Sequence, residues 1–119
     1  MAFNITNLAS VVGTTSATNN IATTGSIIVN TVPSAHVYKI NSVIAANKTG
    51  SAANITLTLN RGSVWTTLAY NMTVPGNAAI ILVGKDAPFY MMDTTSDILS
   101  AAAGTPSAID IIASYEDMS

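Results

Sequence analysis

The chain has 119 residues, a length that suits one domain with one hydrophobic core. Only 8% of the residues are charged, against about 25% in a typical soluble domain, and the formal net charge is −2. The four basic residues are scattered and cysteine is absent, which excludes a basic nucleic-acid-binding stripe, disulfides and thiolate metal sites.

The first segment, residues 1–24, differs in composition from the rest of the chain. Apolar residues such as Phe3, Ile5 and Leu8 precede a polar stretch with no sustained period. This pattern predicts an extended N-terminal arm or leader, followed by a domain over residues 25–119. The apolar residues either dock on a neighbouring chain or form a first strand on the domain's own sheet, and both alternatives remain open. The opening residues lack the pattern of a signal peptide, and no apolar stretch is long enough to predict a membrane span.

The remainder of the chain predicts about eight β-strands, because apolar and polar residues alternate between regularly spaced turns. The predicted strands are 26–32, 36–46, 54–60, 63–74, 78–83, 88–92, 97–103 and 107–115. Alternation is clearest at 54–60, where Ile55, Leu57 and Leu59 should face the core. The continuous apolar run 78–83 predicts a strand buried on both faces.

Turn signals separate these strands and set the expected architecture. Arg61 and Gly62 predict a short turn that joins two strands in a hairpin. A short acidic tail, residues 116–119, is left over, and no segment carries the apolar stripe of a capped helix. The sequence therefore predicts an all-β fold, an antiparallel β-sandwich of jelly-roll type. Eight strands favour this topology over the seven-stranded immunoglobulin-like sandwich.

Four segments follow one another in an order that is found in a known class of proteins: VYKINSVIAAN, ITLTLNRGSVWTTLAYNMTVPGNAAIILVGKDAPFYM, SDILSAAAG and IDIIASYEDMS. The matching positions are Val74, Pro75, Ala78, Lys85, Pro88, Tyr90, Asp97, Leu99 and 113–116. In this order, residues 36–119 resemble small virion structural proteins of tailed bacteriophages. Such proteins occur as capsid cement, head fibres, neck parts and tail parts, and the resemblance brings no catalytic residues with it.

The resemblance implies a non-enzymatic structural protein of the virion, assembled in the host cytoplasm. A capsid cement or decoration protein that stabilises the phage head is the first expectation, and a neck, tail or fibre component is the alternative. The expected partners are further copies in a homo-oligomer, with a trimer favoured, and the major capsid protein or other virion proteins. Neither direct nucleic-acid binding nor membrane binding is expected. The low charge is consistent with a surface that partner chains cover, because neutral groups cost less to desolvate than Lys or Glu.

A catalytic site would depend on His36, the only histidine. A Ser/His/Asp combination would use it with Ser34 and either Asp86 or Asp110, but no nucleophile-elbow motif accompanies them. His36 is better interpreted as the polar opening of a strand. The sequence therefore predicts no enzyme and no catalytic residues.

Acidic residues offer two further combinations, and neither predicts a site. Asp93 and Asp97 could supply oxygen ligands to calcium, but the spacing and glycine of an EF-hand loop are missing. The preferred interpretation is a turn in which Asp97 begins a strand. Asp86 and Asp93 as a glycosidase pair are weaker still. No metal site and no cofactor are expected.

Aromatic residues suggest a last alternative, a carbohydrate- or receptor-binding module. Trp65 could form a sugar-binding platform with other aromatic residues, namely Tyr38, Tyr70, Phe89, Tyr90 and Tyr115. The preferred interpretation is packing in the core and at interfaces, because aromatic side chains supply much of the apolar area of a sandwich.

Overall fold

A computed structural model of the chain describes residues 10–84 and 86–119, and these residues form nine β-strands and no helix. The strands are β1 (Val11–Thr18), β2 (Ser26–Val29), β3 (Val37–Asn47), β4 (Ala53–Arg61), β5 (Val64–Val74), β6 (Ala79–Val83), β7 (Phe89–Met92), β8 (Ile98–Ala103) and β9 (Ile109–Met118). The absence of a helix in these ranges also means that they contain none that could span a membrane.

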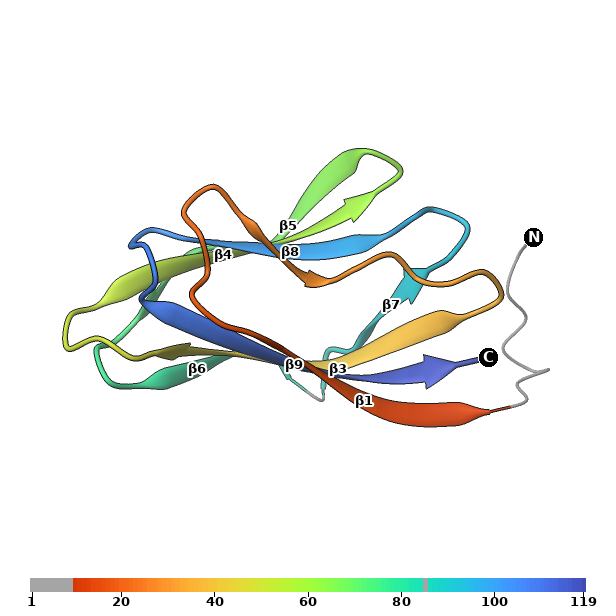
Figure 1. Cartoon of the computed structure of the whole chain (residues 1–119), viewed down its shortest axis with the longest axis horizontal. Helices are drawn as coiled ribbons and strands as arrows, with labels where there is room; N and C mark the ends of the chain where they lie inside the picture. Colours follow the sequence, from red (N-terminus) through yellow and green to blue (C-terminus); the bar gives the residue numbers. More distant parts are fainter. Residues whose placement is uncertain (1–9, 85) are drawn as a thin grey trace.

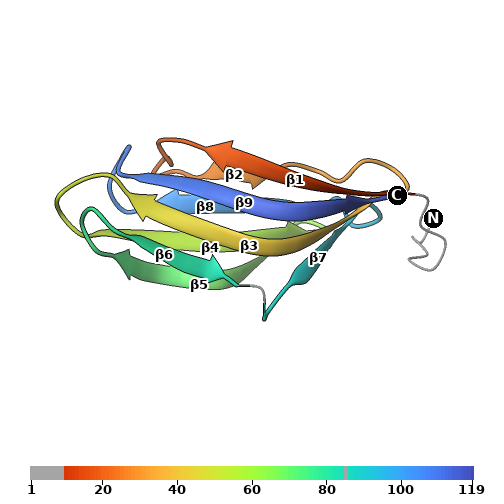
Figure 2. The same ribbon diagram turned by 90° about the horizontal axis from the view of Figure 1, so that it is seen from below.

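The strands form two antiparallel sheets that pack face to face (Figures 1 and 2). Sheet A has five strands in the order β1-β9-β3-β6, with β7 also paired to β3. Sheet B has four strands in the order β2-β8-β4-β5. The all-β sandwich expected from the sequence is confirmed at this level.

The core lies between the two sheets and follows the alternation of the sequence. On β4, buried and partly exposed residues alternate, and Ile55, Leu57 and Leu59 face the core as predicted. The central strand β3 contributes Ile40 and Val43, which are fully buried. Each of the eight predicted strands has a counterpart.

The extended arm over residues 1–24 is not confirmed where the structure describes that segment. Residues 11–18 form β1, which pairs with β9 from Val11 opposite Met118 to Thr18 opposite Ile111. Ile21 follows with no exposed surface. Residues 10–24 are thus part of the domain, and residues 1–9 lie outside the described residues. Alternation is missing in β1 because it is an edge strand with mostly exposed side chains.

Two further expectations need correction. The acidic end is not a tail, because β9 continues to Met118, which is buried opposite Val11. The apolar run 78–83 is not buried on both faces, since β6 is an outer strand and Ile81 is 69% exposed. A run of apolar residues cannot distinguish a buried central strand from an edge strand whose outer face is apolar.

Candidate interaction surface

The structure separates His36 from Asp110, one of the two acids with which it could have formed a Ser/His/Asp site. His36 contacts Asp117 instead, with 2.7 Å between its Nδ1 and the carboxylate Oδ1. Asp110 lies opposite Ala46, near the far end of β3, and pairs with Lys48 at 3.0 Å. Ten residues of strand separate Ala46 from His36, a distance of about 30 Å. His36 and Asp110 therefore cannot belong to one site.

The turn from Asp93 to Asp97 does not form the calcium loop that was considered. Asp97 is fully buried and accepts hydrogen bonds from Arg61, from the Thr95 hydroxyl at 2.6 Å and from the Met92 N–H at 2.9 Å. Burial alone would raise the pKa of Asp97, but these hydrogen bonds outweigh it and the pKa lies below its ordinary value. The Arg61 guanidinium occupies the side of the Asp97 carboxylate at which a calcium ion would bind. Among the described residues, no three acidic or histidine side chains form a possible metal cluster.

The aromatic residues divide into two groups. The rings of Tyr38 and Tyr115 contact each other with centroids 4.7 Å apart and planes inclined at 40°, and both pack against the core, as expected. Burial raises the pKa of both hydroxyls. Trp65 and Tyr70 are instead exposed on β5. The six aromatic residues therefore do not form one platform, and packing in the core accounts for only some of them.

The most unusual feature of the molecule is the exposure of β5. Only the last of its eleven residues, Val74, is buried, and no charged residue or proline lies between Val64 and Val74. Four large apolar side chains form what we call the β5 surface: Val64, Leu68, Tyr70 and Met72, which are 64, 40, 75 and 46% exposed. Together they expose an apolar area of several hundred Å², a size that marks interfaces in soluble proteins.

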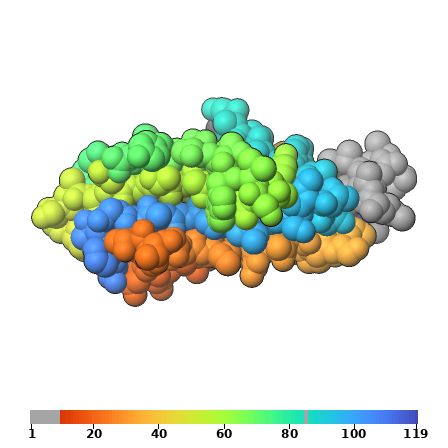
Figure 3. Space-filling view, turned by 90° about the horizontal axis from the view of Figure 1, so that it is seen from above, coloured from red at the N-terminus to blue at the C-terminus, as the bar shows by residue number. Residues whose placement is uncertain are grey.

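This exposure follows from the place of β5 in the sandwich. It is the outermost strand of sheet B, and Figure 1 shows the β4–β5 hairpin rising away from the rest of the layer. Met72 lies opposite Ile55, so it is on the core-facing side of β5, yet sheet A does not cover it. Figure 3 shows the hairpin, in green, standing out on the outer face of sheet B.

A groove of about 430 Å³ continues the β5 surface toward β7. Its lining is apolar except for one cation and consists of Leu59, Arg61, Leu68, Phe89, Tyr90 and Met92. Because Leu68 belongs to both features, the groove adjoins the β5 surface.

The pairing of β5 decides what kind of contact the β5 surface can make. The ladder with β4 is irregular between Ile55 and Leu57 and again between Leu57 and Thr58. At the first irregularity, the Asn71 N–H donates to the Thr56 hydroxyl at 2.9 Å. Such bulges interrupt the row of free backbone groups that a partner strand would need. The β5 surface is therefore suited to contact through side chains rather than through a long added strand.

A second uncovered apolar feature lies on the outer face of sheet A. Ile44 is opposite Ile81 on one side and opposite Ile112 on the other, so the three side chains form one row across β6, β3 and β9. They are 39, 69 and 47% exposed. We call this feature the isoleucine row. It differs in shape and chemistry from the β5 surface.

Sequence reasoning did not single out either feature. The only local signal was the absence of charged residues from VWTTLAYNMTV. Its apolar residues Leu68, Tyr70, Met72 and Val74 alternate with small or polar ones, as in an ordinary half-buried strand, so the pattern gave no sign that the strand is uncovered. The isoleucine row had no local signal, because its members come from three separate strands.

No known protein family matches the chain, and no curated protein shows significant sequence similarity.

Proposed function

We propose that this chain is a non-enzymatic structural protein that works by assembling with other chains. The observation that supports this most is the β5 surface, a set of large apolar side chains at the edge of an otherwise covered core. Leaving several hundred Å² of apolar surface in water is unfavourable, and a partner that covers it gains roughly 25 cal/mol for each Å² removed.

A homo-oligomer is the assembly that these surfaces favour. A standard interface buries about 800 Å² on each partner, which is more than the β5 surface alone offers, so a partner copy would also cover neighbouring residues such as those of the adjoining groove. The isoleucine row offers a second, unlike surface. Contact between unlike surfaces on successive copies runs head to tail and closes into a ring when the rotation between copies divides a full turn, whereas a two-fold dimer uses one surface twice. A closed ring of three copies is the proposed arrangement.

The proposed setting is the virion of a tailed bacteriophage, and its basis is the sequence resemblance over residues 36–119. A capsid cement protein that binds across subunit junctions and stabilises the head is the first choice. A neck, tail or fibre component is the alternative. In the capsid role, the major capsid protein would be the partner that covers whatever apolar surface the oligomer leaves exposed.

The proposed fold within the β-sandwich class is the jelly roll. The chain alternates between the sheets: β1 and β3 lie in sheet A, while β2 and β4 lie in sheet B, and β9 and β8 return beside them. The orders β1-β9-β3-β6 and β2-β8-β4-β5 are those of two interleaved Greek keys, which supports this assignment.

Light scattering of the purified chain tests the assembly directly. We expect an oligomer at micromolar concentration that persists at high salt, because screening weakens only contacts between charges. Tyr70→Lys and Ile81→Lys should each give monomers. Thr105→Lys, which adds the same charge in an exposed turn, should not. A monomeric wild-type chain, or dissociation by salt alone, would contradict the proposal.

Mixing the two variants distinguishes a ring from a two-fold dimer. In a head-to-tail contact, the Tyr70→Lys chain still carries its isoleucine row and the Ile81→Lys chain still carries its β5 surface. One intact contact can then form, so the mixture should yield heterodimers, which a two-fold arrangement would not. The virion role is tested separately by binding of the oligomer to purified empty capsids. Failure to bind capsids would refute the role as a capsid cement protein but would not contradict the proposed homo-oligomer.

A further inference from the structure

A second groove crosses the outer face of sheet B, away from the core and from the isoleucine row. It has a volume of about 310 Å³ and is lined by residues from all four strands of the sheet and from the turn before β2. Ile27 of β2 lies on one side and Trp65 of β5 on the other. In the order β2-β8-β4-β5 they are three strand spacings apart, about 14 Å. We call this feature the outer groove.

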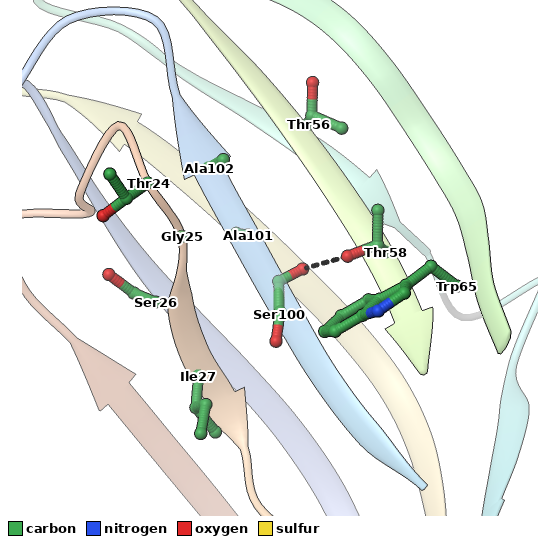
Figure 4. A pocket seen from close by; sticks show the side chains of 10 residues that line it. All are labelled: Thr24, Gly25, Ser26, Ile27, Thr56, Thr58, Trp65, Ser100, Ala101 and Ala102. Atoms are coloured by element: carbon green, nitrogen blue, oxygen red, sulfur yellow. Dashed lines mark hydrogen bonds between the residues drawn. The ribbon is translucent and has the colours of Figure 1, made fainter. Parts of the chain in front are cut away.

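The floor of the outer groove is made of short side chains. Thr56 and Thr58 on β4 and Ser100 on β8 point outward, because the residues that alternate with them face the core. Figure 4 shows the indole of Trp65 extending across β4 toward Ser100. The indole is 58% exposed and is the only large aromatic surface in the groove.

Three hydroxyls on the lining already contact the backbone, and that of Thr58 donates to the Ser100 carbonyl at 3.5 Å (Figure 4). The Thr56 hydroxyl accepts a hydrogen bond from the Asn71 N–H at 2.9 Å, and the Ser26 hydroxyl accepts one from the Ala22 N–H at 3.0 Å. A hydroxyl that accepts from an N–H still has its own hydrogen to donate. These two oxygens are therefore held in place with an O–H available to a ligand.

The lining limits the charge and the kind of ligand. It contains five hydroxyl side chains and no ionisable one. Without a cation, the groove has nothing to neutralise a phosphate, which disfavours nucleotides and nucleic acids. Backbone groups under the groove are already used in the sheet ladders, so an extended peptide would find no strand edge there. Recognition must come from neutral hydroxyls and one flat apolar ring.

We propose that the outer groove binds a neutral carbohydrate, with Trp65 stacking on the apolar face of one sugar ring. A sugar ring presents C–H groups on its faces and hydroxyls around its rim. The indole would cover a face, while Thr56, Thr58, Ser100 and Ser26 would exchange hydrogen bonds with the rim. This site is separate from the assembly proposed above, because it lies on the face of sheet B while the β5 surface lies along its open edge.

The sole tryptophan makes the proposal measurable, because all indole fluorescence of the protein comes from the groove. Titration of the full chain with neutral gluco-, galacto-, manno- and N-acetylglucosamine oligosaccharides should give a saturable change in Trp65 emission for at least one series. Calorimetry with that sugar should then report at least about a tenfold weaker Kd for Trp65→Ala, and a smaller loss for Trp65→Phe. Thr58→Val, which keeps the shape and removes the hydroxyl, should weaken binding several-fold.

Val12→Ala is the control, because Val12 is an exposed apolar residue of β1 that lies outside the outer groove, the β5 surface and the isoleucine row. It should bind the sugar like the wild type. Circular dichroism checks that each variant is folded. Saturation by none of the four series, or equal affinity of the wild type and Trp65→Ala, would overturn the proposal. Light scattering reports the assembly independently, so either proposal can fail while the other stands.

Discussion

Arg61 and Asp97 form a two-pronged ion pair that ties the turn end of the β4–β5 hairpin to the connection between β7 and β8. The Arg61 Nε lies 3.1 and 3.0 Å from the two carboxylate oxygens, and Nη2 lies 2.7 Å from Oδ2. The same Nη2 also donates to the Tyr90 carbonyl of β7 at 3.0 Å. The Asp97 side chain has no exposed surface, whereas that of Arg61 is 45% exposed. The pair therefore holds the hairpin that carries the β5 surface.

Replacing Arg61 by methionine should destabilise the protein. It would leave the Asp97 carboxylate buried without its cation, a change that costs about 3–5 kcal/mol in a fully buried pair. Because Arg61 is partly exposed, we expect a loss of about 2 kcal/mol in the free energy of unfolding, measured by urea denaturation. Lys48→Met is the control, since the Lys48–Asp110 pair is exposed at both ends and should matter by less than about 1 kcal/mol. Equal losses would contradict the role given to Asp97.

The same pair predicts a loss of stability in acid. The pKa of Asp97 is lower in the folded state than in the unfolded chain, where it is about 3.9. Its stabilisation is therefore fully present above that value and is lost as the pH falls below about 4 through the folded pKa. Urea denaturation at a series of pH values should reveal this decline. Asp97→Asn should flatten the decline while lowering stability at neutral pH, and an unchanged slope would refute the assignment.

Replacing Gly76 by alanine should destabilise the protein, whereas replacing Gly13 by alanine should not. A Cβ on Gly76 would lie 2.5 Å from the Gly50 carbonyl carbon, where the turn before β6 meets the turn after β3. Backbone cannot yield as a flexible side chain would, so Gly76→Ala should cost about 1–3 kcal/mol. A Cβ on Gly13 would meet nothing within 4 Å, and Gly13→Ala should be neutral or slightly stabilising. Thermal unfolding of the two variants compares them directly.

Removing residues 1–24 should prevent folding, because this deletion takes away β1 and Ile21. Deletion exposes the edge of β9 and opens the core beside Ile109, whose carbonyl accepts from the Ile21 N–H at 2.9 Å. Ile21→Ala is a milder test and should cost about 3 kcal/mol. Ile27→Ala, at a half-exposed position, should cost less than about 1 kcal/mol. A folded truncated chain, seen as a native circular dichroism spectrum with cooperative unfolding, would restore the arm interpretation.

The sequence by itself determined the elements of the fold. Period-two alternation at Ile55, Leu57 and Leu59 and the turn at Gly62 are local signals, because one buried face and one tight turn each act within a few residues. The Gly62–Ser63 turn has positive φ at both residues, as a two-residue hairpin favours. Sequence reasoning did not identify β1 as a strand and wrongly expected β6 to be buried on both faces, and both strands lie at sheet edges. A strand with little buried surface does not need alternating apolar and polar residues, so its sequence lacks the pattern that predicts a strand.

Only the tertiary structure decided which strands became edges and which side chains remained uncovered. Tyr70 and Met72 are exposed because β5 is the last strand of sheet B, which depends on pairings with strands far away in the chain. The isoleucine row and the outer groove likewise combine residues from three or four strands, so no local stretch contains either of them. The physical reason is that burial depends on neighbours across the sheet and between the sheets. Sequence spacing does not specify those neighbours until the strand order is known.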